Sequence, residues 1–381
     1  MPLQKRTAYR RVTFSLTAIL AIVSLSLSGC SLGSLIPNHQ NPFDDTPIIH
    51  PEDPDKNTSP EDDGGTGGAD KNDQQAAVPS YRNPLTGLMV PTDMSAVRPV
   101  AISYGNSGKA PIQYGIGYAD ILIEAPIETG ETRLLGITTA YPTLSEIGGI
   151  RATRPYLLAF ANAFSAVSVC DGDNDMQAQS SLYPAYAVID CQKQGLSTVF
   201  YHAASFAPPG DLFTSGTRLM GALEGYEKKE ATIPFSFAAG DGEITPTGGG
   251  ASGVVIPFSS IQTTQFTYDC EKHVYLRKQN STTHTDTGTG EALSYKNLLI
   301  LVMESSTYNK VTGSELSLDT SSGGRGFFVT NGAQQDIVWS RDDNGSLSFT
   351  DVAGNPLSLN PGKTYIGMVD IRVSNSVLII S

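Results

Sequence analysis

Positive charge is scarce in this sequence. Its 381 residues include 25 lysines and arginines against 38 aspartates and glutamates, which gives a formal net charge of −13. An acidic chain repels the phosphates of DNA and RNA. The composition therefore excludes nucleic acid as a partner.

Cysteine is also scarce, with four residues, and the chain has no Cys-x-x-Cys pair and no Cys/His cluster. A zinc site is therefore not expected. Apart from Cys30, discussed below, Cys170 and Cys191 each end an apolar stretch. Two interpretations of these two residues stay open: a disulfide between neighbouring strands, or a pair of buried free thiols.

Signatures of hydrolytic enzymes are missing from residues 81–381 as well, since G-x-S-x-G, S-x-x-K and H-E-x-x-H do not occur there. His202, His273 and His284 are isolated in the sequence. The acidic run at residues 171–175 lacks the glycine and the glutamate that an EF-hand needs at its sixth and twelfth positions. We therefore expect no metal and no cofactor.

The longest apolar run is a short one, residues 14–27, whereas a membrane-spanning helix needs about 20 apolar residues. It follows a basic stretch at residues 5–11, an order typical of a signal peptide. Leu27-Ser28-Gly29-Cys30 then matches the lipobox of bacterial lipoproteins. We predict that residues 1–29 are removed and that lipid on Cys30 holds the chain on the extracytoplasmic face of the membrane.

The remaining chain changes composition twice. Residues 30–80 combine the lipidated cysteine with an acidic linker rich in Asp, Pro, Gly, Asn and Ser, which cannot bury a core. Residues 81–240 alternate strand and helix patterns, which predicts an α/β or α+β N-terminal domain. Residues 241–381 contain short strands and turn signals, which predict a smaller, mostly β C-terminal domain.

Individual elements follow from apolar periodicity and from Gly, Pro and Asn signals. Helices are predicted at residues 153–164, 177–186 and 212–226. Strands of the N-terminal domain are predicted at 98–104, 120–124, 132–139, 165–170, 187–190 and 198–202. Strands of the C-terminal domain are predicted at 254–258, 265–268, 274–278, 298–303, 326–329, 337–340, 346–349, 364–369 and 377–380.

Several ordered blocks resemble one family, the YerB-like lipoproteins with domain of unknown function 3048. The resemblance covers roughly residues 81–369 and implies a lipid-anchored envelope protein with two domains, without implying a known reaction. The blocks that carry it begin with Arg82-Asn83-Pro84-Leu85-Thr86-Gly87, Ala119-Asp120-Ile121-Leu122-Ile123-Glu124 and Ile147-Gly148-Gly149-Ile150-Arg151-Ala152-Thr153-Arg154-Pro155-Tyr156, and end with Pro361-Gly362-Lys363-Thr364-Tyr365-Ile366.

Two blocks depart from the family pattern, each by losing a histidine. A His-Ala-Gly-Gly-Ser-like stretch is replaced by Cys170-Asp171-Gly172-Asp173-Asn174. A Pro-His-Asn-Leu-Tyr-Thr-like stretch is replaced by Pro209-Gly210-Asp211-Leu212-Phe213-Thr214. Catalysis through these histidines is therefore not expected in this chain.

The strongest candidate site is a set of arginines and acids in the N-terminal half. Arg151 and Arg154 stand three residues apart at the start of a predicted helix, where backbone amides favour anions. Two interpretations stay open: an anion site for phosphate, diphosphate or carboxylate, or an internal network in which acids pair with the arginines. The candidate residues are Arg133, Arg151 and Arg154 for the ligand and Glu124, Glu128 and Asp120 as their partners.

The leading hypothesis is a non-catalytic binding or adaptor protein of the cell envelope. It would recognise an anionic envelope ligand or a protein of wall synthesis. One alternative is an enzyme acting on phosphorylated or glycan precursors, with Asp120 or Glu124 as acid or base. Another is a structural scaffold for a wall-synthesis protein, which an exposed apolar patch would favour over a pocket.

Overall fold

The computed structural model describes residues 80–108, 111–172, 186–194, 196, 198–227, 229–239, 243–308 and 315–381. All of them fall in one compact unit, Asp73–Ser381. The predicted signal peptide lies outside the described residues. The linker and the helix predicted at residues 177–186 also lie outside them, except for their last residues.

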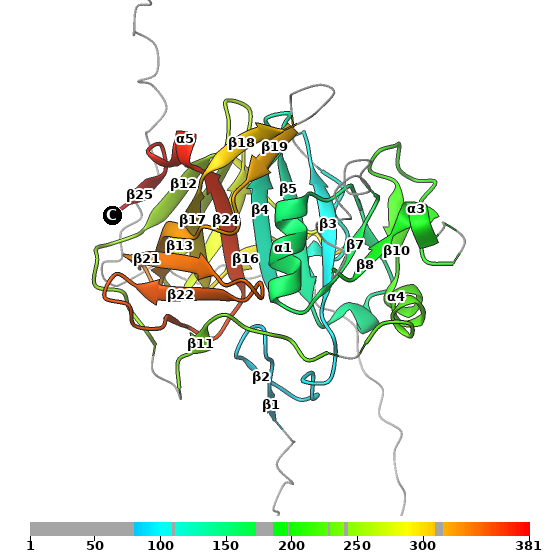
Figure 1. The fold of residues 1–381 in the computed structure, drawn as a ribbon, viewed down its shortest axis with the longest axis horizontal. Helices are drawn as coiled ribbons and strands as arrows, with labels where there is room; N and C mark the ends of the chain where they lie inside the picture. Colours follow the sequence, from blue (N-terminus) through cyan, green and yellow to red (C-terminus); the bar gives the residue numbers. More distant parts are fainter. Residues whose placement is uncertain are drawn as a thin grey trace, which may run out of the picture. The chain divides into compact units, whose positions relative to one another are not determined.

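A mixed ten-stranded sheet runs through the described part of the chain (Figure 1). Its central strands β17, β24 and β4 are parallel, while β5 is antiparallel to both β4 and β3. In spatial order the strands are β22 (Leu347–Asp351), β21 (Ala333–Arg341), β20 (Gly324–Thr330), β17 (Asn297–Met303), β24 (Thr364–Asp370), β4 (Ile121–Pro126), β5 (Thr132–Thr138), β3 (Val100–Asn106), β7 (Val167–Cys170) and β8 (Val188–Asp190).

A second, six-stranded sheet packs on one face of the first. Leu122, Leu298 and Tyr365 from the large sheet share a core with Phe266 and Tyr275 from the second sheet. Phe266 and Tyr365 meet with ring centroids 4.7 Å apart. The second sheet consists of β15 (Thr282–Thr283), β14 (Val274–Gln279), β13 (Thr263–Asp269), β12 (Gly253–Pro257) and β25 (Leu378–Ile380), with β16 (Ser294–Tyr295) also paired to β14.

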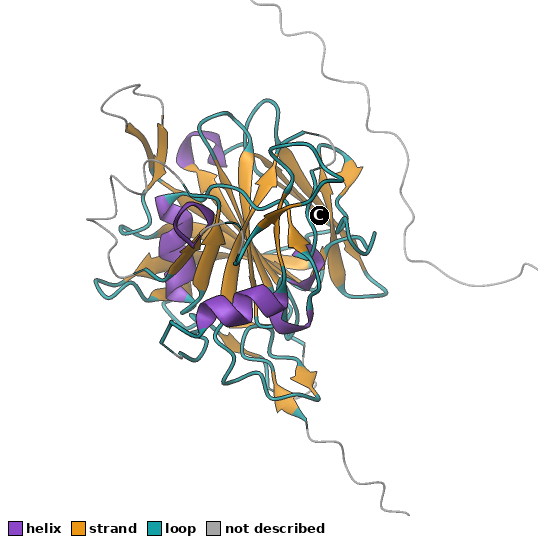
Figure 2. Ribbon diagram, turned by 90° about the vertical axis from the view of Figure 1, so that its right-hand side faces the viewer, coloured by secondary structure: helices purple, strands orange, loops and turns teal. Residues whose placement is uncertain are grey.

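The other face of the large sheet is covered by helix α1 (Pro155–Ala163) and by further segments that share its core. Because both faces are covered, every residue of the central strand β17 is buried, which explains the unbroken apolar run LLILVM that follows Asn297. Figure 2 shows the helices outside a strand-rich interior. The remaining helices are η1 (Ile116–Tyr118), η2 (Tyr141–Thr143), α3 (Cys191–Gln194), α4 (Gly216–Leu223) and α5 (Ile371–Ser374).

Short strand pairs complete the described fold. They are β1 (Tyr81–Arg82) with β2 (Met89–Val90), β10 (Leu212–Thr214) between β6 (Ile147–Gly148) and β9 (Tyr201–His202), β11 (Ser236–Phe237) with β23 (Ser358–Leu359), and β18 (Ser305–Tyr308) with β19 (Glu315–Leu318).

The prediction of a strand-rich C-terminal region is confirmed, whereas the α/β character of residues 81–240 is not. Within that region the long strands pair largely antiparallel, and only α1, α3 and α4 are α-helical in its described part. The pairing of β4 with β24 joins strands from both sides of residue 240, so the two regions share one sheet.

The helix predicted at residues 212–226 is partly wrong. Residues Leu212–Thr214 form strand β10, and the helix begins only at Gly216. Ser215 caps it, since its hydroxyl accepts the backbone N–H of Arg218 at 3.3 Å. A buried apolar stretch before a cap was mistaken for the first turn of the helix.

Candidate functional site

The predicted arginines converge at the N-terminus of α1. Arg154 is the N-cap residue, with extended backbone angles (φ −134°, ψ 152°) and no side-chain cap. Pro155 opens the helix, where its missing N–H is no loss. The prediction of a helix at residues 153–164 is confirmed within two residues, with Arg154 rather than Thr153 as the cap.

Arg133 lies beneath this helix start, on strand β5. Its neighbours Leu134 and Leu135 point into opposite cores, and alternation along the strand places Arg133 on the α1 side with Leu135. Its residue surface is only 4% exposed. Its Nε and Nη1 atoms are buried and have no hydrogen-bond partner in the described part of the chain.

Burial and the two other guanidiniums act on Arg133 in the same direction. Burial lowers the pKa of Arg133 most, and the charges of Arg154 and Arg151 lower it further, to about 10. Arg133 is therefore still charged at neutral pH. A buried charge with no partner is unfavourable, and proteins ordinarily pair or solvate it.

Arg151 approaches Arg133 across Gly105 of strand β3. A Cβ at Gly105 would lie 2.9 Å from Cγ of Arg151 and 3.7 Å from Nη1 of Arg133, so a side chain there would crowd both arginines. The backbone N–H of Arg151 donates to the Ser103 carbonyl at 2.8 Å, which fixes the arginine against the sheet. Close by, the buried hydroxyl of Thr153 also lacks a partner in the described part of the chain.

Arg154 does have an acidic partner. Its Nε donates to Oε2 of Glu128 at 3.1 Å, and its Nη2 donates to Oε1 of the same carboxylate. Burial opposes ionisation of Glu128, but the bonds from Arg154 lower the pKa of that carboxyl. The site therefore brings together three guanidiniums and two carboxylates, because Asp171 interacts with Arg151 as Glu128 does with Arg154, which leaves an excess of one positive charge.

Glu124 is not part of this group, contrary to the expectation from the sequence. It lies opposite Leu134 on β5 and faces the second sheet. Its two oxygens accept bonds from Asn106, Thr132, Thr264, Arg277 and Tyr365, at 3.2, 2.7, 2.8, 2.7 and 2.8 Å. The carboxylate is therefore completely engaged between the two sheets.

The network around Glu124 continues into the second sheet. Arg277 and Glu124 form an ion pair in which both side chains are fully buried. Nη1 of Arg277 donates to Nδ1 of His284, so the proton of that ring is on Nε2, which donates to Oε1 of Gln113. Burial, followed by the charge of Arg277, holds the pKa of His284 well below its usual value.

Asp120 also lies away from the arginines. It precedes β4, whereas Arg133 pairs with Ala125 near the end of that strand, roughly 15 Å away at about 3.3 Å per residue. Asp120 accepts bonds from Nδ2 of Asn83 and the backbone N–H of Thr139 at 3.4 and 3.2 Å. Burial raises the pKa of Asp120 to about 6, although these bonds and the charge of Lys363 oppose the shift.

Sequence reasoning missed the partners of Glu124. Arg277 is 153 residues from Glu124, and Tyr365 is 241 residues away. One local signal was present: Arg277 occupies the same face of β14 as the buried Tyr275 and Gln279. A charged residue in the buried register of an alternating strand indicates a buried partner.

Among the described residues, no cluster of three or more His, Cys, Asp and Glu side chains could hold a metal ion. Of the acidic run at residues 171–175, only Asp171 and Gly172 are described. No helix in the described ranges has the length and apolar content needed to cross a membrane.

Two family descriptions match this chain. "Protein of unknown function (DUF3048) N-terminal domain" matches residues 85–229, and "Protein of unknown function (DUF3048) C-terminal domain" matches residues 254–366. The first region contains the arginine site, and the second contains Arg277 and most of the sheet that faces Glu124.

A curated protein and a solved structure are similar over most of the chain. The protein is described as "Putative lipoprotein YerB" from Bacillus subtilis (strain 168) and is 28% identical over 308 residues, covering 78% of this chain and 89% of its own. The structure is the crystal structure of the YerB protein from Bacillus subtilis, with 25% identity and a TM-score of 0.69. It covers 79% of this chain and 100% of its own.

Proposed function

The chain belongs to the DUF3048 family of YerB-like proteins, and from this premise we propose that it is a membrane-anchored lipoprotein that binds an anionic ligand of the cell envelope. The lipobox ending at Cys30 and the description of the relative as a lipoprotein support an anchor on the extracytoplasmic face. Arg133, Arg151 and Arg154 form the proposed ligand site.

One observation carries this proposal: Arg133 is 4% exposed, and two of its buried nitrogens have no hydrogen-bond partner among the residues that the structure describes. A guanidinium placed there without an anion destabilises the fold, so a bound anion is the simplest source of compensation. Arg offers a planar fork of donors that suits the oxygens of phosphate and carboxylate. The start of α1 adds backbone dipoles that favour the same charge.

The planar donor groups of the arginines favour a ligand with several anionic oxygens. Glu128 holds Arg154 in place through two bonds, and Asp171 interacts with Arg151. Arg133 and Arg151 are the arginines assigned to the ligand. We therefore favour phosphate or diphosphate esters, including lipid-linked diphosphates, over a single carboxylate.

The enzyme alternative needs Asp120 or Glu124 as an acid or base next to the arginines. Glu124 is enclosed by five donors on the opposite face of the sheet, and Asp120 precedes the other end of β4. Neither carboxylate lies beside the arginines. The binding hypothesis is therefore the one that the geometry supports best.

Calorimetric titration of the full chain with inorganic diphosphate tests the proposal. We expect binding by the native chain and a loss of about 10-fold or more in Arg133→Met, because a hydrogen bond to a charged group contributes about 1.5–3 kcal/mol. Arg325→Met is the matched control, since Arg325 is exposed on β20. Equal affinity in the two variants, or no binding by the native chain, would overturn the proposal and favour a scaffold role.

A further inference from the structure

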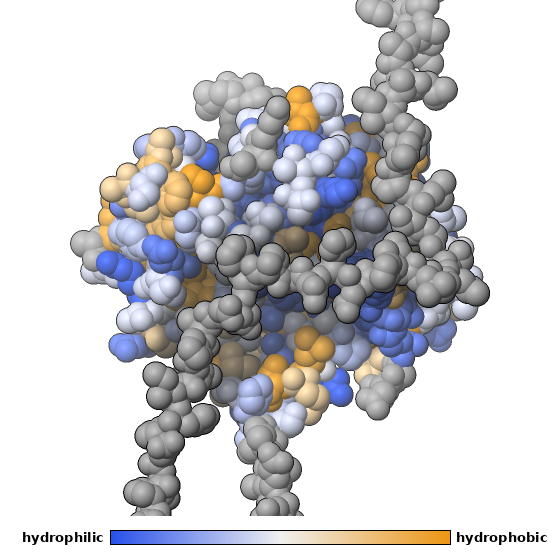
Figure 3. Space-filling view, turned by 180° about the vertical axis from the view of Figure 1, so that it is seen from behind, coloured by the Kyte–Doolittle hydropathy of each residue, from blue (hydrophilic) through white to orange (hydrophobic). Residues whose placement is uncertain are grey.

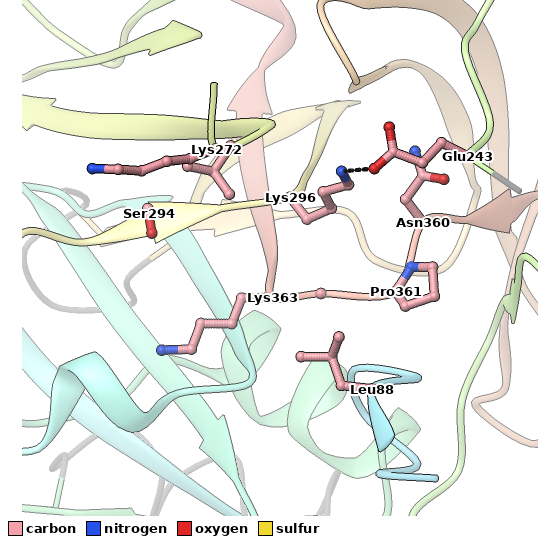
Figure 4. A pocket seen from close by; sticks show the side chains of 10 residues that line it. Leu88, Glu243, Lys272, Ser294, Lys296, Asn360, Pro361 and Lys363 are labelled. Atoms are coloured by element: carbon pink, nitrogen blue, oxygen red, sulfur yellow. Dashed lines mark hydrogen bonds and ion pairs between the residues drawn. The ribbon is translucent and has the colours of Figure 1, made fainter. Parts of the chain in front are cut away.

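A pocket lies at the opposite end of strands β4 and β24 from the arginine site. It has no role in ligand binding by the arginines. It has a volume of about 440 Å³, within the range of small-molecule sites. Figure 4 shows its walls, which come from segments distant in sequence. Leu88 precedes β2, Val274 begins β14, Ser294 lies in β16, and Lys363 immediately precedes β24.

The residues that line this pocket carry a net positive charge, whereas the whole chain is negatively charged. Lys272, Lys296 and Lys363 line it, and Glu243 is the one acid among its lining residues. A local positive excess in a chain of net charge −13 attracts anions to this place. The pocket therefore differs electrostatically from the surface around it.

Most of the acceptor groups in the pocket are already engaged. Nζ of Lys296 donates to Oε1 of Glu243 at 2.6 Å, and Nδ1 of His273 lies 3.2 Å from Oε2 of the same carboxylate. The Asn360 amide is bonded to the backbone N–H and carbonyl of Ile244, at 2.7 and 2.8 Å. A ligand would therefore meet few free acceptors here.

The groups that remain are donors. Figure 4 shows Lys272 and Lys363 pointing toward the same side of the pocket, with Ser294 between them, while Lys296 turns toward Glu243. Lys272 forms a long ion pair with Asp269 at 3.8 Å, and its side chain is 73% exposed, so it can also reach a ligand. Lys363 donates to the Gly117 carbonyl, which leaves it two further N–H donors, and it interacts electrostatically with Asp120, Glu291 and Asp286.

An apolar wall stands beside these donors. Leu88, Val274 and Pro361 line the pocket, and Leu88 is 44% exposed although it is a large aliphatic residue. Figure 3 shows exposed hydrophobic residues along the lower edge of the molecule, the edge where β1 and β2 lie in Figure 1. An apolar body bound at this wall would remove leucine and proline surface from water.

We propose that this lysine pocket binds an amphiphilic anion, in which a phosphate or carboxylate contacts Lys272, Lys363 and Ser294 while an attached apolar body packs on Leu88 and Pro361. The proposal is independent of the arginine site, because the pocket lies at the start of β24 and Arg133 lies level with the end of the parallel strand β4. The source of the ligand is either a soluble molecule or a lipid head group.

Saturation-transfer NMR with the full chain in neutral phosphatidylcholine nanodiscs tests this inference. The probe is phenyl phosphate, and phenyl glucoside is the uncharged comparison. We expect phenyl phosphate to bind more tightly. We also expect Lys272→Ala to weaken it about 10-fold, the loss of one charge-assisted hydrogen bond, and Leu88→Ser to weaken it roughly 3- to 10-fold through lost apolar contact.

The controls separate this pocket from the arginine site and identify the source of the ligand. Lys278→Ala removes a lysine outside the pocket from β14, the strand that follows Lys272, and Arg133→Met alters only the arginine site, so both should bind the probe normally. Competition by phosphatidylglycerol added to the nanodiscs would assign the ligand to the bilayer, and its absence would assign it to a soluble molecule. Equal binding of the two probes, or equal effects of Lys272→Ala and Lys278→Ala, would overturn the inference.

Discussion

Glu124 and Arg277 are 153 residues apart in the sequence, yet their side chains form an ion pair at 2.7 Å with neither exposed to solvent. Glu124 belongs to the large sheet and Arg277 to the second sheet. The pair therefore lies at the centre of a buried polar network between the two sheets, and it joins the two family regions to each other.

Removing the charge of Glu124 should destabilise the protein strongly. In Glu124→Gln, amide N–H groups replace an oxygen toward which Arg277, Thr264 and Tyr365 all donate. Breaking a buried ion pair from one side costs about 3–5 kcal/mol of unfolding free energy, because the remaining charge stays buried. Urea unfolding of the native chain and the variant measures this loss.

The matched control for this variant is Glu271→Gln, because Glu271 is exposed in the turn after β13. It should change the unfolding free energy by less than about 0.5 kcal/mol. The double variant Glu124→Gln/Arg277→Met should lose less than the sum of the two single losses, since the partners are coupled. Additive effects would show that the pair does not act as a unit.

For Arg133 we predict the opposite effect on stability. Replacing its buried guanidinium, two of whose nitrogens have no acceptor among the described residues, with the apolar side chain of methionine should stabilise the ligand-free protein by about 1–4 kcal/mol. A binding residue that destabilises the free fold is a common form of the trade-off between stability and function. Thermal unfolding of the native chain, Arg133→Met and Arg325→Met in buffer without phosphate measures the effect.

Diphosphate distinguishes the two roles of Arg133 in the same experiment. Added to the native chain it should raise the unfolding temperature, because a ligand that binds only the folded state stabilises that state. It should raise the unfolding temperature of Arg133→Met much less, because that variant binds diphosphate more weakly. If Arg133→Met were less stable than the native chain, Arg133 would be part of the structural core, and no ligand would be needed to explain its burial.

The sequence predicted strands more reliably than it predicted which side chains meet. The strands predicted at residues 298–303 and 364–369 are present as β17 and β24. Both strands are buried on both faces of the sheet, so each is a continuous and mostly apolar run that the sequence reveals. The helix predicted to begin at residue 212 begins four residues later, at Gly216, because Leu212–Thr214 form a strand that pairs with β6 and β9. Tertiary pairing overrode the local pattern there.

The candidate site was predicted in its basic half and misjudged in part of its acidic half. Arg151 and Arg154 were placed by their spacing at a helix start, which is a local property. Glu124 was assigned to them because it is near in sequence, but its position on β4 points it to the other face of the sheet. The facing of a strand residue depends on register and on distant partners, neither of which a single sequence displays.

Asp120 gives a prediction about pH. Its pKa rises from 3.8 to about 6 on folding, so between these values the folded chain holds a proton that the unfolded chain has lost. Stability from this group therefore increases as pH falls from 7 to below 4, by roughly 3 kcal/mol at most. Asp120→Asn should remove that part of the pH dependence, and the difference between the two unfolding free energies, measured from pH 4 to 7, reports it.

The comparison with Asp120→Asn cancels other titrating groups, because they are present in both chains. The native chain should approach the stability of the variant at low pH and fall below it near neutrality. Parallel curves over the whole range would mean that Asp120 ionises normally in the folded protein and that Asn83 and Thr139 offset its burial.

The cysteines left open by the sequence give a prediction about thiol reactivity. Cys170 and Cys191 are free and buried, and Cys170 lies opposite Asp190 rather than Cys191 in the pairing of β7 with β8. Burial raises the pKa of Cys191 to about 11 and raises that of Cys170 still further, which suppresses the reactive thiolate. Cys270 is exposed, so in the native chain an aromatic disulfide reagent should modify it first.

Denaturant should then release the other two thiols together, because both are protected by the same sheet edge. Cys270→Ser should abolish the fast phase and leave the slow phase intact. A disulfide between Cys170 and Cys191 would require the pairing of β7 with β8 to rearrange. Two missing thiols after denaturation without reductant, restored by reductant, would show that the disulfide had formed and that the free thiols described here are not the state in solution.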